Sequence, residues 1–92
     1  MTTDLHPAIT AQALADSLRA ALAPTTLEVL DETGHHAGHA GANPSGSGSH
    51  FRVRIASPLF GHLPRVRQHR LVYDALQEWI DRGVHAIAIE IL

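Results

Sequence analysis

The hydrophobic positions near the start of the chain recur with the spacing of an α-helix. Leucines stand four residues apart, and one alanine falls on the same face as the leucines. These residues are Leu14, Leu18, Ala21 and Leu22. Because side chains at i and i+4 share one side of a helix, the spacing predicts a helix with a buried stripe. Pro7 is suited to open this helix, and Pro24 ends it.

Two later runs predict β-strands that form an antiparallel pair. The first, Thr26 to Asp31, holds Leu27, Val29 and Leu30 among residues that tolerate a strand. In the second run, apolar residues alternate with arginines, which is the period of a strand with one buried face. The inward set is Phe51, Val53 and Ile55, and the outward set is Arg52 and Arg54.

The segment between these strands, residues 33–49, is rich in Gly, Ser, Ala and His and contains Pro44. Such a composition cannot bury enough apolar surface to order itself. It predicts a flexible loop.

The second half of the chain predicts a short turn, a long helix and a closing strand. Pro58 to Pro64 is punctuated by two prolines and suits a single helical turn. A helix is expected from Arg65 to Arg82, with Gly83 at its C-terminal cap. Its expected apolar stripe is Val66, His69, Tyr73, Leu76 and Ile80, with Trp79 beside it. A histidine on such a stripe, here His69, is expected to be a hydrogen-bonded core residue.

The final run, Val84 to Leu92, alternates apolar residues as a strand does. Ile87, Ile89 and Ile91 fall on one face, and the same alternation places His85 on the core side at the start of the strand.

The predicted order is α-β-β-α-β. Two amphipathic helices cover the apolar face of one three-stranded sheet, and the helix between the second and third strands permits a parallel crossover. The sequence thus predicts an α+β two-layer sandwich with a mixed sheet and both helices on one face. At this length, residues 1–92 are expected to form a single domain.

Composition narrows the classes of function. The 92 residues include no cysteine, which excludes disulfides, and the formal net charge of −2 gives no overall attraction to nucleic acid. The N-terminal residues do not resemble a signal peptide, and no apolar run approaches the roughly 20 residues of a membrane-spanning helix. We therefore expect a cytoplasmic protein. With no cysteine nucleophile, no Gly-x-Ser-x-Gly elbow and no phosphate-cradling loop, it is not expected to be an enzyme.

Several linked segments resemble the BolA family in order and spacing, over nearly the whole chain. They are Leu27-Glu28-Val29, Asp31-Glu32-Thr33-Gly34-His35-His36, Ser49-His50-Phe51-Arg52-Val53, Phe60-Gly61, Arg67-Gln68-His69-Arg70-Leu71-Val72-Tyr73 and Val84-His85-Ala86-Ile87-Ala88-Ile89. The resemblance implies a class II KH-like fold, a monothiol glutaredoxin as partner and a role in iron–sulfur cluster trafficking or assembly. Some members of the family are transcriptional regulators.

The resemblance also implies a ligand set for a [2Fe–2S] cluster shared with the glutaredoxin and glutathione. A glutaredoxin cysteine and the glutathione thiol would supply sulfur, and this chain would supply His85 and a histidine of the loop. Gly34-His35-His36-Ala37 resembles the histidine loop of His-type members, which favours His36, with His35 and His39 as competitors. The isolated chain is expected to carry no cluster and to be a monomer or a weak homodimer.

Other interpretations of these histidines stay open. From its strand position alone, His85 would be a half-buried residue satisfied by a backbone carbonyl. Without the resemblance, His35, His36 and His39 would be a solvated loop or an adventitious Zn or Ni site, since imidazole suits those metals. His50 is either a strand cap or a third candidate ligand, and the structural role is preferred.

A second hypothesis is a DNA-binding transcriptional regulator. Arg65, Arg67 and Arg70 crowd the start of the long helix, where cations oppose the helix dipole, and they suit contacts to DNA phosphates. Together with Arg52 and Arg54, they could instead await another anion, such as a glutathione carboxylate or an acidic surface. KH-type RNA binding is disfavoured, because Gly61-His62-Leu63-Pro64 lacks the second glycine of a GxxG loop.

Overall fold

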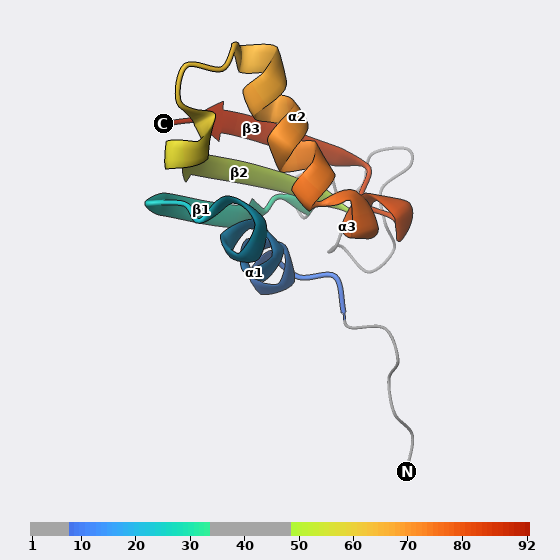
Figure 1. Cartoon of the computed structure of the whole chain (residues 1–92). Helices are drawn as coiled ribbons and strands as arrows, with labels where there is room; N and C mark the ends of the chain where they lie inside the picture. Colours follow the sequence, from blue (N-terminus) through green and yellow to red (C-terminus); the bar gives the residue numbers. More distant parts are fainter. Residues whose placement is uncertain (1–7, 34–48) are drawn as a thin grey trace.

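The computed structural model describes residues 8–33 and 49–92 (Figure 1). The loop candidates His35, His36 and His39 lie outside the described residues, as does most of the segment predicted to be flexible. The helices are α1 (Ala11–Leu22), the 3-10 turn η2 (Pro58–Phe60), α2 (Arg65–Ala75) and α3 (Gln77–Asp81). The strands are β1 (Thr26–Asp31), β2 (His50–Ala56) and β3 (Ala86–Ile91). No helix within the described ranges is long and apolar enough to cross a membrane.

The predicted sheet topology is confirmed. The three strands lie in the order β1-β2-β3, with β1 antiparallel and β3 parallel to the central strand. The register pairs Val53 with Val29 on one side and with Ile89 on the other. Because β2 and β3 are parallel, the chain between them must return along the sheet, and α2 with α3 provides this crossover.

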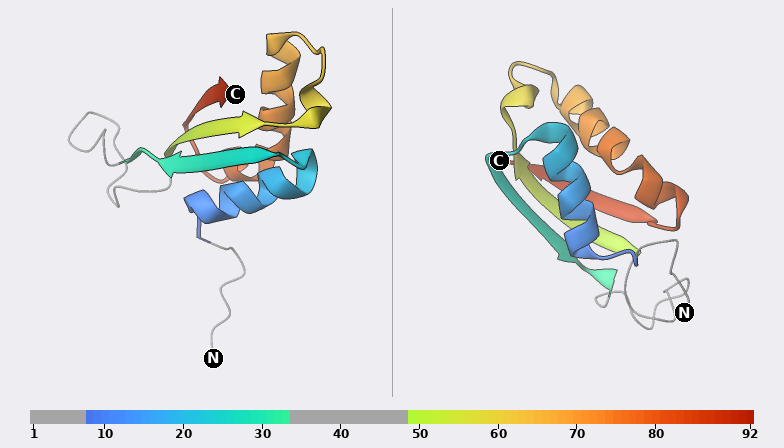
Figure 2. Two further views of the ribbon diagram at one scale, coloured as in Figure 1. Left: turned by 90° about the vertical axis from the view of Figure 1, so that its left-hand side faces the viewer. Right: turned by 60° about the horizontal axis from the view of Figure 1, so that its bottom comes forward.

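The helices form one layer that covers a single face of the sheet, as Figure 2 shows. The predicted inward residues of β2 are buried against them, and the arginines between these residues point to the open face. The core is the cluster Leu14, Leu18, Leu22, Phe51, Val53, Ile55, Phe60, Val72, Leu76, Trp79 and Val84. The predicted two-layer α+β arrangement is therefore correct.

Helix α1 begins later than predicted. The Thr10 side chain accepts a hydrogen bond from the Ala13 amide and caps the helix, so that Ala11, and not a residue near Pro7, is its first residue. Ala21 is exposed, and Ala15 is the buried alanine. The two alanines flank the leucine stripe on opposite sides, each about 60° from its centre, so the buried face of α1 extends from the leucines toward Ala15.

The long helix predicted from Arg65 to Arg82 is two helices, because the chain departs from helical geometry at Leu76. The bend buries Trp79 against α1, where its indole nitrogen donates a hydrogen bond to Ser17 Oγ at 2.8 Å. The predicted stripe is wrong at two positions: Val66 is 71% exposed and Tyr73 is 40% exposed. Gly83 follows Arg82, the C-cap of α3, and adopts a φ of +127°, a conformation that residues with side chains rarely adopt.

Candidate functional site

The ends of segment 34–48 are held together by a buried threonine. Thr33 Oγ1 accepts hydrogen bonds from the backbone amides of Ser49 (3.1 Å) and His50 (3.0 Å), and its own amide donates to the Asp31 carboxylate at 2.9 Å. Thr33 and Ser49 are each 1% exposed. The segment that carries His35, His36 and His39 therefore leaves and rejoins the fold at one fixed point beside β2.

That fixed point also anchors the start of β3. The Ser49 carbonyl accepts two hydrogen bonds, from the amides of His85 (2.8 Å) and Ala86 (3.2 Å). Because two successive amides bond to one carbonyl, the side chains at this point do not alternate between the two faces of the sheet as they do in a regular strand. Val84 fills the core position, and the His85 side chain is exposed. The prediction that His85 faces the core was therefore wrong, because the regular strand begins only at Ala86.

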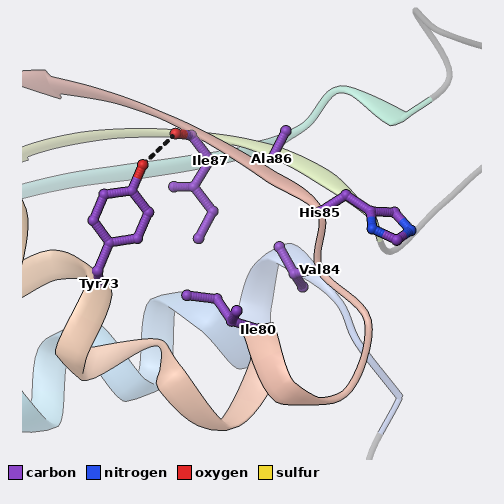
Figure 3. A pocket seen from close by; sticks show the side chains of 6 residues that line it. All are labelled: Tyr73, Ile80, Val84, His85, Ala86 and Ile87. Carbon is purple, nitrogen blue, oxygen red and sulfur yellow. Dashed lines mark hydrogen bonds between the residues drawn. The ribbon is translucent and has the colours of Figure 1, made fainter.

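His85 forms the rim of a shallow hollow between β3 and the helices, shown in Figure 3. The hollow has a volume of about 310 Å³ and is lined by Tyr73, Ile80, Val84, His85, Ala86 and Ile87. Tyr73 Oη donates a hydrogen bond to the Ile87 carbonyl at 3.4 Å. The imidazole of His85 points away from the other labelled side chains (Figure 3). An exposed imidazole beside apolar walls is accessible to a partner molecule.

His50, the first residue of β2, lies beside His85. The centroids of the two imidazole rings are 6.2 Å apart, with their planes inclined by 54°. His50 Nδ1 is hydrogen-bonded to Ser49 Oγ at 2.9 Å. In the described ranges, 8–33 and 49–92, no three His, Cys, Asp or Glu side chains are grouped so that they could hold a metal ion. What this end of the sheet presents is two adjacent imidazoles.

The predicted basic residues separate into two groups with different surroundings. Arg65, Arg67 and Arg70 are exposed on α2, where Arg67 and Arg70 line a second hollow of about 310 Å³ with Val66. These side chains suit an anionic partner.

Arg52 and Arg54 lie on the open face of the sheet and are paired with carboxylates. The ion pairs are Arg52–Glu32 at 2.9 Å, Arg52–Glu90 at 2.7 Å, Arg54–Glu28 at 2.9 Å and Arg54–Glu90 at 3.2 Å. The side-chain hydrogen bond to Glu32 is the main reason why the pKa of Arg52 is raised, and that to Glu28 raises the pKa of Arg54. Arg52 and Arg54 thus form ordinary ion pairs with glutamates on neighbouring strands and beside β1, which disfavours the alternative that they await an external anion.

His69 does not have the full set of hydrogen bonds predicted for it. Its Nε2 atom is buried and has no hydrogen-bond partner within the described part of the chain. The exposure of Val66 and Tyr73 on either side of it shows that this face of α2 is only partly in the core. The apolar stripe of the sequence did not reveal this, because helical spacing does not show where a helix overhangs its sheet.

Residues 18–92 match the family model described as BolA: BolA-like protein. The chain belongs to the BolA family. The resemblance noted in the sequence is thereby confirmed, and so is the fold that it implied: the BolA domain of SufE1 from Arabidopsis thaliana is similar with a TM-score of 0.77. That similarity has 36% sequence identity and covers 88% of this chain and 87% of the solved domain.

Two curated relatives show the range of proteins that contain BolA sequences. BolA-like protein 1 of Mus musculus is 41% identical over 78 residues, which are 85% of this chain and 53% of the mouse protein. The DNA-binding transcriptional regulator BolA of Escherichia coli is 39% identical over 74 residues, 80% of this chain and 66% of that protein. This BolA chain thus spans about half the length of the mouse relative.

Proposed function

We propose that this BolA-family chain is an adaptor that binds a monothiol glutaredoxin and contributes imidazole ligands to a shared [2Fe–2S] cluster. The role is binding, not turnover, in iron–sulfur cluster trafficking or assembly or in iron and redox regulation. The observation that supports it most is the placement of His85: its side chain is exposed, and its amide is bonded to Ser49, where the histidine-bearing segment rejoins the fold.

The chemistry of the chain fits a shared site better than one of its own. A [2Fe–2S] cluster takes four ligands, usually thiolates, and histidines can replace cysteines on one iron. This chain has eight histidines and no cysteine. It can therefore supply the imidazole half of the set, while the glutaredoxin cysteine and glutathione supply sulfur. Bound in this way, the cluster would serve as an electron carrier or as transferable cargo.

The second imidazole is proposed to come from the loop, with His36 as the first choice and His35 and His39 as competitors. An extended chain spans at most about 3.6 Å per residue, so three residues beyond Thr33 give His36 a reach of roughly 11 Å before its side chain is counted. Thr33 is hydrogen-bonded to His50, whose ring lies 6.2 Å from that of His85. The length of chain available thus permits the pairing.

The test is anaerobic reconstitution of a cluster with a monothiol glutaredoxin and glutathione, followed by visible absorption and circular dichroism. His85→Ala should abolish or shift the spectrum of the mixed complex, and His36→Ala should do the same if it is the loop ligand. His62→Ala is the matched control, because His62 is exposed and lies outside the site. A mixed complex of His85→Ala with the spectrum of the unmodified protein would exclude His85 as a ligand.

A second candidate function is DNA binding through the start of α2. It is supported by the exposure of Arg65, Arg67 and Arg70, by the hollow that the last two line, and by the name of the Escherichia coli relative. Each phosphate contact contributes about −0.9 to the slope of log K against log salt concentration.

Salt-titrated binding to duplex DNA tests this alternative. The double variant Arg67→Ala/Arg70→Ala should reduce the slope by roughly 2 units. Arg19→Ala is the matched control, since Arg19 is an exposed arginine on the other long helix. An unchanged slope in the double variant would count against the DNA-binding function.

A further inference from the structure

The juxtaposition of His50 and His85 follows from the pairing of β2 with β3. His50 is the first residue of β2 and pairs in register with Ala86, the first residue of β3. His85 precedes that pair, and its amide is held by the Ser49 carbonyl at 2.8 Å. The two histidines are therefore presented by neighbouring parallel strands at the same end of the sheet.

Ser49 fixes the orientation of the His50 ring. Its hydroxyl is 2.9 Å from His50 Nδ1, and the residue is 1% exposed, so that its position is set by the core and by the Thr33 contact to its amide. A histidine that binds a metal through one ring nitrogen commonly donates its other N–H to a fixed oxygen, which sets the tautomer and the direction of the ring. With Nδ1–H donating to Ser49 Oγ, coordination by His50 would proceed through Nε2.

The rings lie close to the separation that a single metal ion requires. Zinc binds imidazole nitrogen at about 2.0–2.1 Å in tetrahedral geometry, which places the centroids of two rings on one ion about 5 Å apart. The observed centroids are 6.2 Å apart, so the rings must approach by roughly 1 Å to share an ion. The His85 side chain is exposed, so it can rotate to complete the geometry with little disturbance of the core.

We propose that His50 and His85 bind one divalent transition-metal ion, such as Zn²⁺, with Ser49 as the residue that positions His50. Imidazole is a suitable ligand for zinc, copper and nickel. Zinc is normally four-coordinate, so water or a partner's side chain would complete the set. The site goes beyond the proposed adaptor function, because it requires neither glutaredoxin nor iron. The site can therefore fail its test without affecting the adaptor proposal.

The test uses the full chain in which His35→Ala, His36→Ala and His39→Ala remove the other nearby histidines. Zinc titration by calorimetry measures the affinity, and each of His50→Ala and His85→Ala should lower it at least about tenfold in that background. Ser49→Ala should lower it by roughly 10–100-fold, the usual range for residues that orient a metal ligand. The control His62→Ala should leave the affinity unchanged.

A second measurement needs no substitution at the site itself. In long-range ¹H–¹⁵N spectra of the imidazoles, zinc should shift one nitrogen of His50 and one of His85 while His50 Nδ1 stays protonated. His62 should not shift. Equal zinc affinity with and without His50, or a spectrum in which zinc shifts His85 alone, would overturn the two-histidine site.

Discussion

The indole N–H of Trp79 donates a hydrogen bond of 2.8 Å to the hydroxyl of Ser17, and this contact joins α3 to α1 across 62 positions of sequence. Trp79 is 5% exposed and belongs to the hydrophobic core. The break at Leu76 turns the indole toward α1. The hydrogen bond therefore forms only when α3 packs against α1.

Ser17→Ala should destabilise the fold by about 1–3 kcal/mol, because it leaves a buried N–H group without its partner. Chemical denaturation followed by the fluorescence of Trp79, the single tryptophan of the chain, measures the change. Asp16→Asn, at an exposed position on the same helix, is the control and should have a much smaller effect. Equal stability of Ser17→Ala and the unmodified protein would show that this bond adds nothing to docking.

Thr33 offers a second test, directed at the ends of the histidine-bearing segment. Thr33→Ala removes the acceptor for the amides of Ser49 and His50, whereas Thr33→Ser keeps it. Amide hydrogen exchange at residues 49 and 50 should therefore become faster by roughly 5- to 150-fold in the alanine variant and change little in the serine variant, because loss of the acceptor lowers the free energy of local opening by about 1–3 kcal/mol. Unaltered exchange in Thr33→Ala would mean that Thr33 does not hold this point of the fold.

The sheet could be predicted from the sequence because its signal is local. Phe51, Val53 and Ile55 alternate with arginines along a central strand, and burial on one face requires this pattern. The direction of His85 could not be predicted in the same way. It depends on two amides sharing the Ser49 carbonyl, a contact 36 residues away in sequence that shifts the alternation by one position.

Helix boundaries show the same division between local and tertiary signals. The proline at position 64 and the spacing of apolar residues predicted the start of α2 correctly. The break at Leu76 has no glycine or proline to mark it, and it follows from tertiary packing of Trp79 against α1. The family resemblance added what neither pattern contained, namely which of eight histidines to test first.

Val66 and Leu76 provide a matched pair that tests the observed core against the predicted stripe. Leu76 is fully buried and Val66 is 71% exposed, although the apolar spacing placed both on one face. Leu76→Ala should cost about 2–5 kcal/mol. Val66→Ala should change the free energy of unfolding by no more than about 0.5 kcal/mol. Denaturant titrations of the two variants measure both values, and similar losses would favour the predicted stripe over the observed one.

The open face of the sheet gives the final prediction, because Glu90 bridges Arg52 and Arg54. Glu90→Gln should lower the thermal midpoint slightly in low salt, since exposed ion pairs stabilise weakly. At 1 M salt the screening length falls to about 3 Å, so the difference from the unmodified protein should shrink. A loss of the same size at both salt concentrations would show that Glu90 acts through packing and not through charge.

The pH dependence of this contribution follows from the direction of the arginine pKa shifts. The pKa values of Arg52 and Arg54 are raised in the folded protein, mainly by the side-chain hydrogen bonds to Glu32 and Glu28 and next by Glu90, through its hydrogen bond to Arg52 and its charge beside Arg54. A group with a raised pKa stabilises the fold at every pH below its unfolded-state pKa and loses this effect only as the pH rises through its folded-state pKa. For arginine that window lies above pH ~12. The difference in thermal midpoint between Glu90→Gln and the unmodified protein should therefore stay constant from about pH 7 to pH 10. A steady decline across that range would show that Glu90 does not act through its ion pairs with Arg52 and Arg54.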